Sequence, residues 1–138
     1  MKTILLVEDN QDDERLAMRA LRTLGVESHV VIARDGQAAV EMLHGPNRIV
    51  PHLVLLDLKI PKICGLDVLR QIRARPETQH LPVVILTSSD EAIDIEQSFE
   101  AGGNSYIRKS IDLDDFTDAI CQIGNYWLSL NEPATASV

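Results

Sequence analysis

The sequence predicts an α/β domain in which a doubly wound parallel sheet carries helices on both faces. Short apolar segments alternate five times with segments of helical apolar spacing along the 138 residues. Three of the apolar segments contain no polar interruption, which is typical of strands buried on both faces of a parallel sheet. No change of composition marks a linker, so we expect five βα units with right-handed crossovers in one domain.

The strand expected at the centre of the sheet is Leu53 to Leu56, which stops at the carboxylate of Asp57. Pro61 cannot donate to a strand ladder, so the strand should end near Leu58. Asp57 is therefore expected at the carboxyl end of a strand, where open α/β sheets bind their ligands. A carboxylate at that position can be a nucleophile, a metal ligand or one half of a structural ion pair.

The first βα unit combines a buried strand, Thr3 to Val7, with an amphipathic helix. Apolar residues recur at helical spacing from Leu16 to Leu24 and define the buried face of this helix. Its expected N-cap is Asn10 or Asp12, and its expected C-cap is Gly25.

The other units follow the same alternation of strand and helix. Further strands are expected at Ser28 to Ala33, Leu81 to Leu86 and Ser105 to Ile107. A short helix supported by Ala38, Ala39 and Leu43 is expected to end at Gly45-Pro46. Further helices are expected from Gly65 to Arg73, after a capping box of Ser88 and Glu91, and from Asp112 onwards.

Polar side chains follow most of the expected strands at the point where each strand ends. Glu8 and Asp9 follow the first strand, Asp57 the central one, Thr87 the next and Lys109 the last. Because the carboxyl ends of parallel strands meet at one edge of a sheet, we expect these groups to lie close together.

This set of groups suits phosphoryl transfer. Adjacent carboxylates repel one another, and a hard cation such as Mg²⁺ relieves the repulsion while it clamps phosphoryl oxygens. Asp57 could then attack phosphorus and become an aspartyl phosphate. Lys109 supplies a positive charge and Thr87 a hydroxyl donor for the transferred oxygens.

Composition limits the partners and the compartment. A formal net charge of −8 argues against direct binding to nucleic acid or to an anionic membrane surface. Cys64 and Cys121 form no disulfide framework, and the N-terminal apolar stretch is too short for a signal peptide. No segment has the apolar length of a membrane span, so a cytoplasmic location is expected.

The functional residues, taken in order, resemble the receiver domain of two-component response regulators. The matching positions are Val7-Glu8-Asp9-Asn10, Asp57 with Pro61 and Gly65, Thr87-Ser88, Tyr106 and Lys109. The resemblance covers about the whole chain and implies a flavodoxin-like (βα)5 fold with strand order 2-1-3-4-5. It also implies a receiver domain over residues 1–130. The tail over residues 131–138, which contains Pro133 and small residues, is expected to be flexible.

The resemblance assigns a role to each matching residue. Asp57 would accept phosphate from a sensor histidine kinase, and Lys109 would pair with the phosphoryl group. Thr87 and Tyr106 would form the switch. The Mg²⁺ ligands would be Glu8, Asp9, Asp57 and the main-chain oxygen of Lys59. Two positions depart from the family pattern: Cys64 stands where Asp or Asn is common, and Ser110 stands where proline is common after the lysine.

The expected function is phosphorylation-controlled signalling rather than turnover of a separate substrate. The domain would assist its own phosphorylation and dephosphorylation, and its output would pass through a changed protein-binding surface to a target that the sequence does not name. A haloacid-dehalogenase-like phosphatase needs a second Asp where Lys59 stands. An FMN-binding flavodoxin needs a phosphate-binding loop where Glu8 and Asp9 stand. A receiver-like interaction module that works without phosphate is disfavoured because every acceptor-site group is present.

The C-terminal segment predicts an interface. Its apolar residues recur every three or four positions at Leu113, Phe116, Ile120, Ile123, Trp127 and Leu130. A helix from Asp112 to Leu130 would be about 28 Å long, whereas central strands span roughly 17–20 Å. The first half would pack on the core through Leu113, Phe116 and Ile120.

The second half would extend past the sheet and support a homodimer. The expected interface residues are Tyr126, Trp127, Leu128 and Leu130. The alternative is that Trp127 folds back onto the domain's own core. The ending Asn125-Tyr126-Trp127-Leu128 also resembles regulators that partner phytochrome-type sensor kinases, which implies a kinase of that class.

Overall fold

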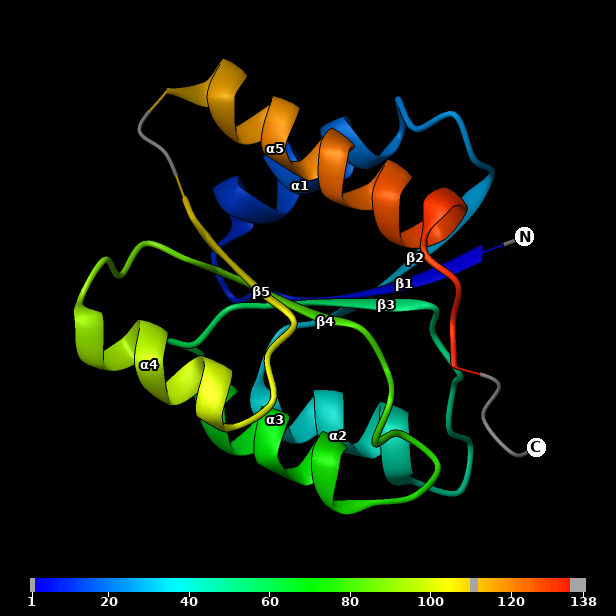
Figure 1. The fold of residues 1–138 in the computed structure, drawn as a ribbon, viewed down its shortest axis with the longest axis vertical. Coiled ribbons are helices and arrows are strands. Elements are labelled where there is room, and N and C mark those ends of the chain that lie inside the picture. The colour runs from blue at the N-terminus through cyan, green and yellow to red at the C-terminus, as the bar shows by residue number, and fades with distance from the viewer. Residues whose placement is uncertain (1, 110–111, 135–138) are drawn as a thin grey trace.

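A computed structural model describes residues 2–109 and 112–134, which form a five-stranded parallel sheet between two layers of helices (Figure 1). The sheet order is β2-β1-β3-β4-β5, as expected. The strands are β1 (Lys2–Val7), β2 (Ser28–Ala33), β3 (Leu53–Leu56), β4 (Val83–Thr87) and β5 (Ser105–Arg108). The helices are α1 (Gln11–Leu21), α2 (Gly36–His44), α3 (Gly65–Ala74), α4 (Ala92–Glu100), α5 (Leu113–Asn125) and η1 (Tyr126–Leu130).

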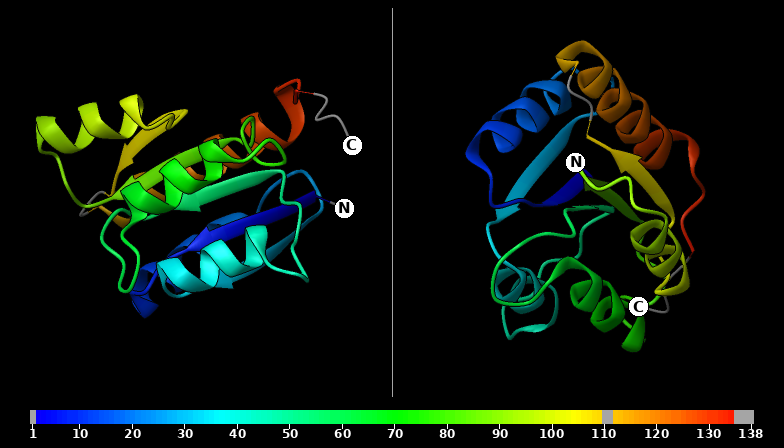
Figure 2. Two further views of the ribbon diagram at one scale, coloured as in Figure 1. Left: turned by 90° about the horizontal axis from the view of Figure 1, so that it is seen from below. Right: turned by 90° about the vertical axis from the view of Figure 1, so that its left-hand side faces the viewer.

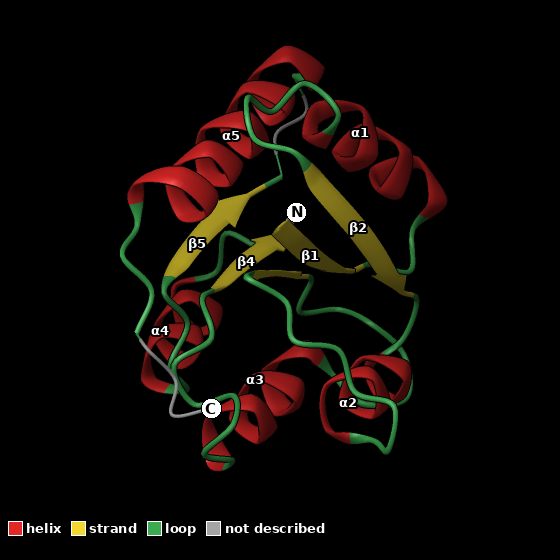
Figure 3. Ribbon diagram, turned by 90° about the vertical axis from the view of Figure 1, so that its right-hand side faces the viewer, coloured by secondary structure: helices red, strands yellow, loops and turns green. Residues whose placement is uncertain are grey.

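Two separate cores lie on the two faces of the sheet. Helices α1 and α5 cover one face, and α2, α3 and α4 cover the other (Figures 1 and 3). Successive residues of β3 alternate between the two cores: Leu53 and Leu55 pack with the α1 and α5 side, Val54 and Leu56 with the α2 and α3 side. All four are essentially without solvent contact. Each such side chain stabilises the fold by about 1.5–3 kcal/mol, which explains the uninterrupted apolar sequence of this strand.

Strand β3 lies between β1 and β4, so the residues that follow it are at the middle of the sheet edge. The backbone N–H of Asp57 donates to the carbonyl oxygen of Val7 at 3.1 Å, which continues the ladder between β1 and β3 by one residue. Segment η1 lies at the opposite end of the sheet, the end at which β1 begins (Figures 1 and 2). Within the described ranges, no helix combines the length and apolar character needed to cross a membrane.

Helix α1 begins as expected but ends earlier. Asn10 is the N-cap, and its side chain accepts a hydrogen bond from the backbone N–H of Asp13 at 3.0 Å. The expected C-cap at Gly25 is wrong, because the helix ends at Leu21 with Arg22 as its C-cap. The chain then makes tighter three-residue turns before it reaches the glycine.

The capping box expected at Ser88 and Glu91 is also wrong. Ser88 is exposed, and Glu91 itself is the N-cap of α4 without a side-chain hydrogen bond. The buried hydroxyl of Ser89 instead accepts from the Glu91 N–H at 3.3 Å and donates to Asp94. Ser89 makes these contacts in place of Ser88 because β4 ends at Thr87 and the Ser89 side chain is buried.

The C-terminal helix differs from the expected regular stripe. Leu113 was expected in the core, but it is exposed at the first position of α5. Leu128 was expected at an exposed interface, but it is 5% exposed and packs in the core with α1 and α5. Tyr126 and Leu130 are exposed as expected. A π-helical turn changes the register here and carries Leu128 inward.

The Trp127 side chain folds back onto the domain's own core, which was the alternative to an exposed interface residue. It packs against the α1 and α5 core and lines a cavity of about 170 Å³ with the loops that precede β3 and β4. Pro133, in the first part of the expected tail, lines the same cavity. The last four residues of that tail, 135–138, lie outside the described residues.

Candidate functional site

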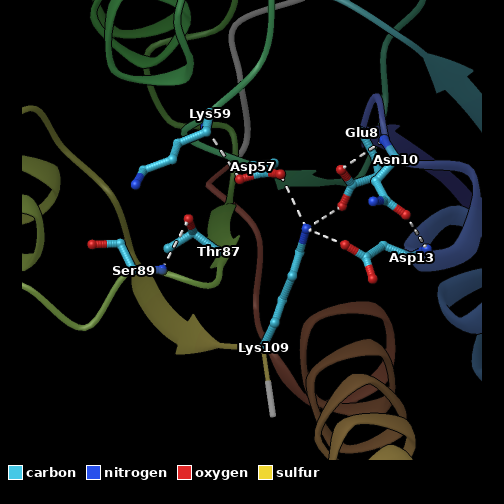
Figure 4. Close-up of polar contacts among 8 residues, drawn as sticks. All are labelled: Glu8, Asn10, Asp13, Asp57, Lys59, Thr87, Ser89 and Lys109. Carbon is cyan, nitrogen blue, oxygen red and sulfur yellow. Dashed lines mark hydrogen bonds and ion pairs between the residues drawn. The ribbon is translucent and has the colours of Figure 1, made fainter. Parts of the chain in front are cut away.

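The carboxyl ends of four strands bring the expected polar side chains together (Figure 4). Glu8 directly follows β1, Asp57 follows β3, Thr87 ends β4 and Lys109 follows β5. Figure 4 shows the Lys109 ammonium between the carboxylates, with Thr87 on the other side of Asp57. The rule that polar groups gather at strand ends therefore placed these four residues correctly.

Asp57 is held in one orientation by contacts to both of its carboxylate oxygens. Its Oδ1 accepts from the backbone N–H of Lys59 at 3.2 Å, and its Oδ2 accepts from Lys109 Nζ at 3.0 Å. The residue is 7% exposed. A nucleophilic carboxylate benefits from such a fixed orientation, because attack requires an aligned oxygen.

Lys109 uses its ammonium to bridge three carboxylates. Nζ donates to Glu8, to Asp13 Oδ2 at 2.9 Å and to Asp57 Oδ2 at 3.0 Å. Burial alone would lower the pKa of Lys109, but the hydrogen bonds to Glu8 and Asp13 and the charge of Asp57 raise it well above its usual range. The ammonium therefore stays charged at every pH at which the protein is folded.

Asp13 was not among the residues expected at this site. It lies in the first turn of α1, where the Asn10 cap holds its backbone. Sequence reasoning about strand ends could not find it, because it belongs to a helix. A carboxylate in the first helical turn after a strand-end acidic pair is the signal that could have found it.

Glu8 is a buried acid with a strongly altered affinity for protons. It is 3% exposed, and burial raises the pKa of its carboxyl to about 7, with a further increase from the charge of Asp57. The hydrogen bond from Lys109 opposes this shift. One oxygen of Glu8 also accepts from the Asn10 backbone N–H at 3.3 Å.

The acidic residues have the arrangement of a site for a hard cation. Carboxylate oxygens of Glu8, Asp9 and Asp57 lie within 4.8 Å of one another, and Asp9 is open to solvent. Opposite ligands of an octahedral Mg²⁺ are about 4.2 Å apart, so the spacing of these oxygens suits an ion of this size. The backbone N–H of Lys59 donates to Asp57, so the main chain of Lys59, whose oxygen is the expected fourth ligand, runs beside this cluster.

The two expected switch residues are linked through Ser89. Thr87 is fully buried, and its Oγ1 accepts a long hydrogen bond from the Ser89 N–H at 3.5 Å. The Tyr106 hydroxyl donates to the Ser89 carbonyl oxygen at 2.8 Å. Burial raises the pKa of Tyr106, so its hydroxyl remains a donor. Ser110, the departure after the site lysine, lies outside the described residues.

Comparison with known sequences gives a consistent set of relatives. The family described as response regulator receiver domain matches residues 4–121. Response regulator Rcp1 of Synechocystis sp. is 39% identical over 131 residues, which are 92% of this chain and 89% of the relative. The probable methanogenesis regulatory protein FilR2 of Methanothrix harundinacea is 39% identical over 131 residues, which are 93% of this chain and 84% of the relative.

Solved structures show the same similarity. The phosphorylated cyanobacterial phytochrome response regulator RcpA superposes with a TM-score of 0.91 at 38% identity and covers 97% of this chain and 99% of its own. The Mn²⁺-bound form of Rcp1 superposes with a TM-score of 0.91 at 37% identity and covers 98% of this chain and 100% of its own.

Proposed function

The chain belongs to the response regulator receiver family, and from that premise we propose that Asp57 accepts a phosphoryl group from a sensor histidine kinase. The observation that carries the proposal is the Asp57 carboxylate, fixed at the end of β3 with the Lys109 ammonium 3.0 Å from one oxygen. Glu8 and Asp9 complete an acidic pocket around it.

In the proposed reaction, a carboxylate oxygen of Asp57 attacks the phosphorus of a phosphohistidine. The new P–O bond forms as the P–N bond breaks, and the imidazole nitrogen keeps the electron pair and takes a proton. A divalent cation such as Mg²⁺, held by Glu8, Asp9, Asp57 and the main-chain oxygen of Lys59, would neutralise charge on the phosphoryl oxygens. Lys109 and the Thr87 hydroxyl supply a cation and a donor to the same oxygens.

Phosphorylation would then move the loop that follows β4. A phosphoryl group adds about two negative charges, enough to draw the Thr87 hydroxyl towards it. Because Thr87 and Tyr106 are both bonded to Ser89, such a movement would disturb the Tyr106 contact and alter the surface around α4 and β5. Amide exchange with and without beryllofluoride should change at residues 87–92 and 104–109, and changes confined to the vicinity of Asp57 would contradict the switch.

Intact-mass spectrometry tests the acceptor. After incubation with acetyl phosphate and Mg²⁺, the protein should carry a single phosphate adduct. The adduct should disappear in Asp57→Asn and persist in Asp67→Asn, a control at an exposed acid paired with Arg70. An adduct that survives Asp57→Asn would overturn the assignment, and no adduct in the unmodified protein would favour an interaction module that works without phosphate.

The proposed kinase is of the phytochrome type. The support is the similarity to RcpA, which is described as a cyanobacterial phytochrome response regulator. A phytochrome-type kinase should transfer phosphate to this chain faster than a chemotaxis-type kinase does. Equal transfer rates from both would contradict the pairing.

We also propose a homodimer through the exposed part of the C-terminal segment, Tyr126 and Leu130. Both are large apolar residues without cover, whereas Leu128 belongs to the domain's own core. Light scattering should show a dimer that the double substitution Tyr126→Ser with Leu130→Ser converts to a monomer. A monomeric unmodified protein at high concentration, with or without phosphate, would contradict this.

A further inference from the structure

We propose that Asp13 is a positioning residue for phosphoryl transfer, which holds the Lys109 ammonium against the acceptor carboxylate. The inference rests on the function proposed above for Asp57. Its basis is the contact between Asp13 Oδ2 and Lys109 Nζ at 2.9 Å, made while the same nitrogen contacts Asp57 at 3.0 Å. Figure 4 shows Asp13 reaching Nζ from α1, whereas Glu8 and Asp57 reach it from strand ends.

The Asp13 side chain is itself well placed to hold a lysine. The Asn10 cap accepts from the Asp13 backbone N–H at 3.0 Å, so the residue is locked into the first turn of α1. Its side chain is 31% exposed and therefore forms the outer wall of the pocket. The contact thus ties a mobile four-carbon side chain on the β5 side to a rigid helix start.

The three contacts of Lys109 account for its three N–H donors. When Asp57 carries a phosphoryl group, the donor now on Asp57 would turn to a phosphoryl oxygen, and Glu8 and Asp13 would remain as anchors. Because Asp13 and Asp57 are contacted at the same time, Asp13 holds the ammonium towards the acceptor and not away from it. Loss of Asp13 would leave one donor without a protein partner and widen the range of Nζ positions.

Asp13 does not belong to the expected metal ligands. Among the residues that the structure describes, the three carboxylates whose oxygens all lie within 4.8 Å of one another are Glu8, Asp9 and Asp57. A role through Lys109 therefore predicts a loss of reaction rate with little loss of metal affinity. A role through the overall charge of the pocket predicts that both change together.

The test compares Asp13→Asn with Asp12→Asn. Both substitutions remove one negative charge from adjacent positions, but the Asp12 side chain is 87% exposed and pairs only loosely with Arg15 at 3.8 Å. At saturating Mg²⁺, Asp13→Asn should lower the maximal rate constant for phosphorylation by acetyl phosphate about tenfold, less than the roughly hundredfold that a 1 Å misplacement of a catalytic group can cost, because Glu8 still anchors the ammonium. The half-saturating acetyl phosphate concentration and the calorimetric Mg²⁺ affinity should change less than about twofold, and Asp12→Asn should match the unmodified protein.

A second readout does not depend on the reaction. In ¹⁵N-labelled protein without metal, the Lys109 Nζ–H₃ signal should be protected from solvent exchange, and this protection should be lost in Asp13→Asn and kept in Asp12→Asn. If Asp13→Asn perturbs the backbone spectrum, Asp13→Ser, which keeps a polar residue in the first turn, takes its place.

Three results would overturn the proposal: equal rates in the two variants, a rate loss matched by an equal loss of Mg²⁺ affinity, or Lys109 protection that survives Asp13→Asn. If the unmodified protein accepts no phosphate at all, the function proposed for Asp57 fails instead. In that case, the Lys109 signal alone decides whether Asp13 positions the ammonium.

Discussion

The buried acid Glu8 should make the stability of the metal-free protein fall as the pH rises through neutrality. In the folded protein, burial raises the pKa of this carboxyl to about 7, whereas the unfolded chain releases the proton near 4.5. Between these values the folded state binds more protons than the unfolded state. The free energy of unfolding must therefore decrease as the pH rises across this window and level off above it.

The size of this effect follows from the width of the window. A pKa difference corresponds to about 1.4 kcal/mol for each unit, so a rise from 4.5 to about 7 gives roughly 3.5 kcal/mol as an upper limit. Asp9, on the solvent side of the pocket, is exposed, and water there screens part of the interaction. We therefore expect about 1–2 kcal/mol, or roughly 3–8 °C in the melting temperature of a domain of this size.

Two histidines act in the opposite direction within the same pH range. Burial lowers the pKa values of His44 and His52, so as the pH falls the unfolded state binds their protons before the folded state does. Their contribution to the free energy of unfolding therefore increases as the pH rises through the window. The Glu8 contribution must therefore be isolated by comparing the unmodified protein with Glu8→Gln. This variant leaves the Lys109 ammonium with two carboxylate partners and does not strand a buried charge.

Urea unfolding in EDTA from about pH 5 to about pH 8 measures the difference. Glu8→Gln should lose stability with rising pH less steeply than the unmodified protein and should be the more stable of the two at the alkaline end. Added Mg²⁺ should stabilise the unmodified protein most at that end, because the ion binds the charged form. Parallel pH profiles for the two proteins would refute the reasoning.

Two further predictions concern the backbone beside the acceptor and the C-terminal turn. A Cβ at Gly65 would lie 2.2 Å from the Asp57 carbonyl oxygen, so Gly65→Ala should displace the acceptor loop and slow phosphorylation. It should also lower the free energy of unfolding by about 1–3 kcal/mol. A Cβ at Gly25 would have its nearest neighbour at 4.0 Å, so Gly25→Ala should be nearly neutral in both urea unfolding and the phosphorylation assay. In thermal unfolding, Leu128→Ala should lower the free energy of unfolding by about 2–4 kcal/mol, whereas Leu130→Ala should change it by no more than about 0.5 kcal/mol. Equal losses of stability in the two variants would contradict the observed π-helical register.

The sheet and the strand-end residues could be predicted because each depends on a short stretch of sequence. An apolar run of four or five residues defines a doubly buried strand wherever the sheet is parallel. Once the strands are assigned, parallel geometry alone places Glu8, Asp57, Thr87 and Lys109 at one edge. No knowledge of loop conformation is needed for that step.

Residues whose position depends on a loop or on a helix rotation could not be predicted in the same way. Asp13 reaches Lys109 only because the Asn10 cap sets where α1 begins and how it is rotated. Ser89, not Ser88, bonds to the start of α4 because of where β4 ends. In both cases a shift of one residue would change which side chain faces the site.

The C-terminal segment shows why apolar spacing alone does not separate a core from an interface. Regular spacing of three and four residues predicts one continuous stripe only if every turn has about 3.6 residues. In η1 the Asn131 N–H donates to the Tyr126 carbonyl at 2.8 Å, a bond across five residues that inserts extra chain into the turn. Leu128 consequently enters the core, while Leu130, a member of the predicted stripe, points to solvent. The spacing identifies a helix with an apolar face, but the hydrogen-bond register at its end decides which residues remain for a partner.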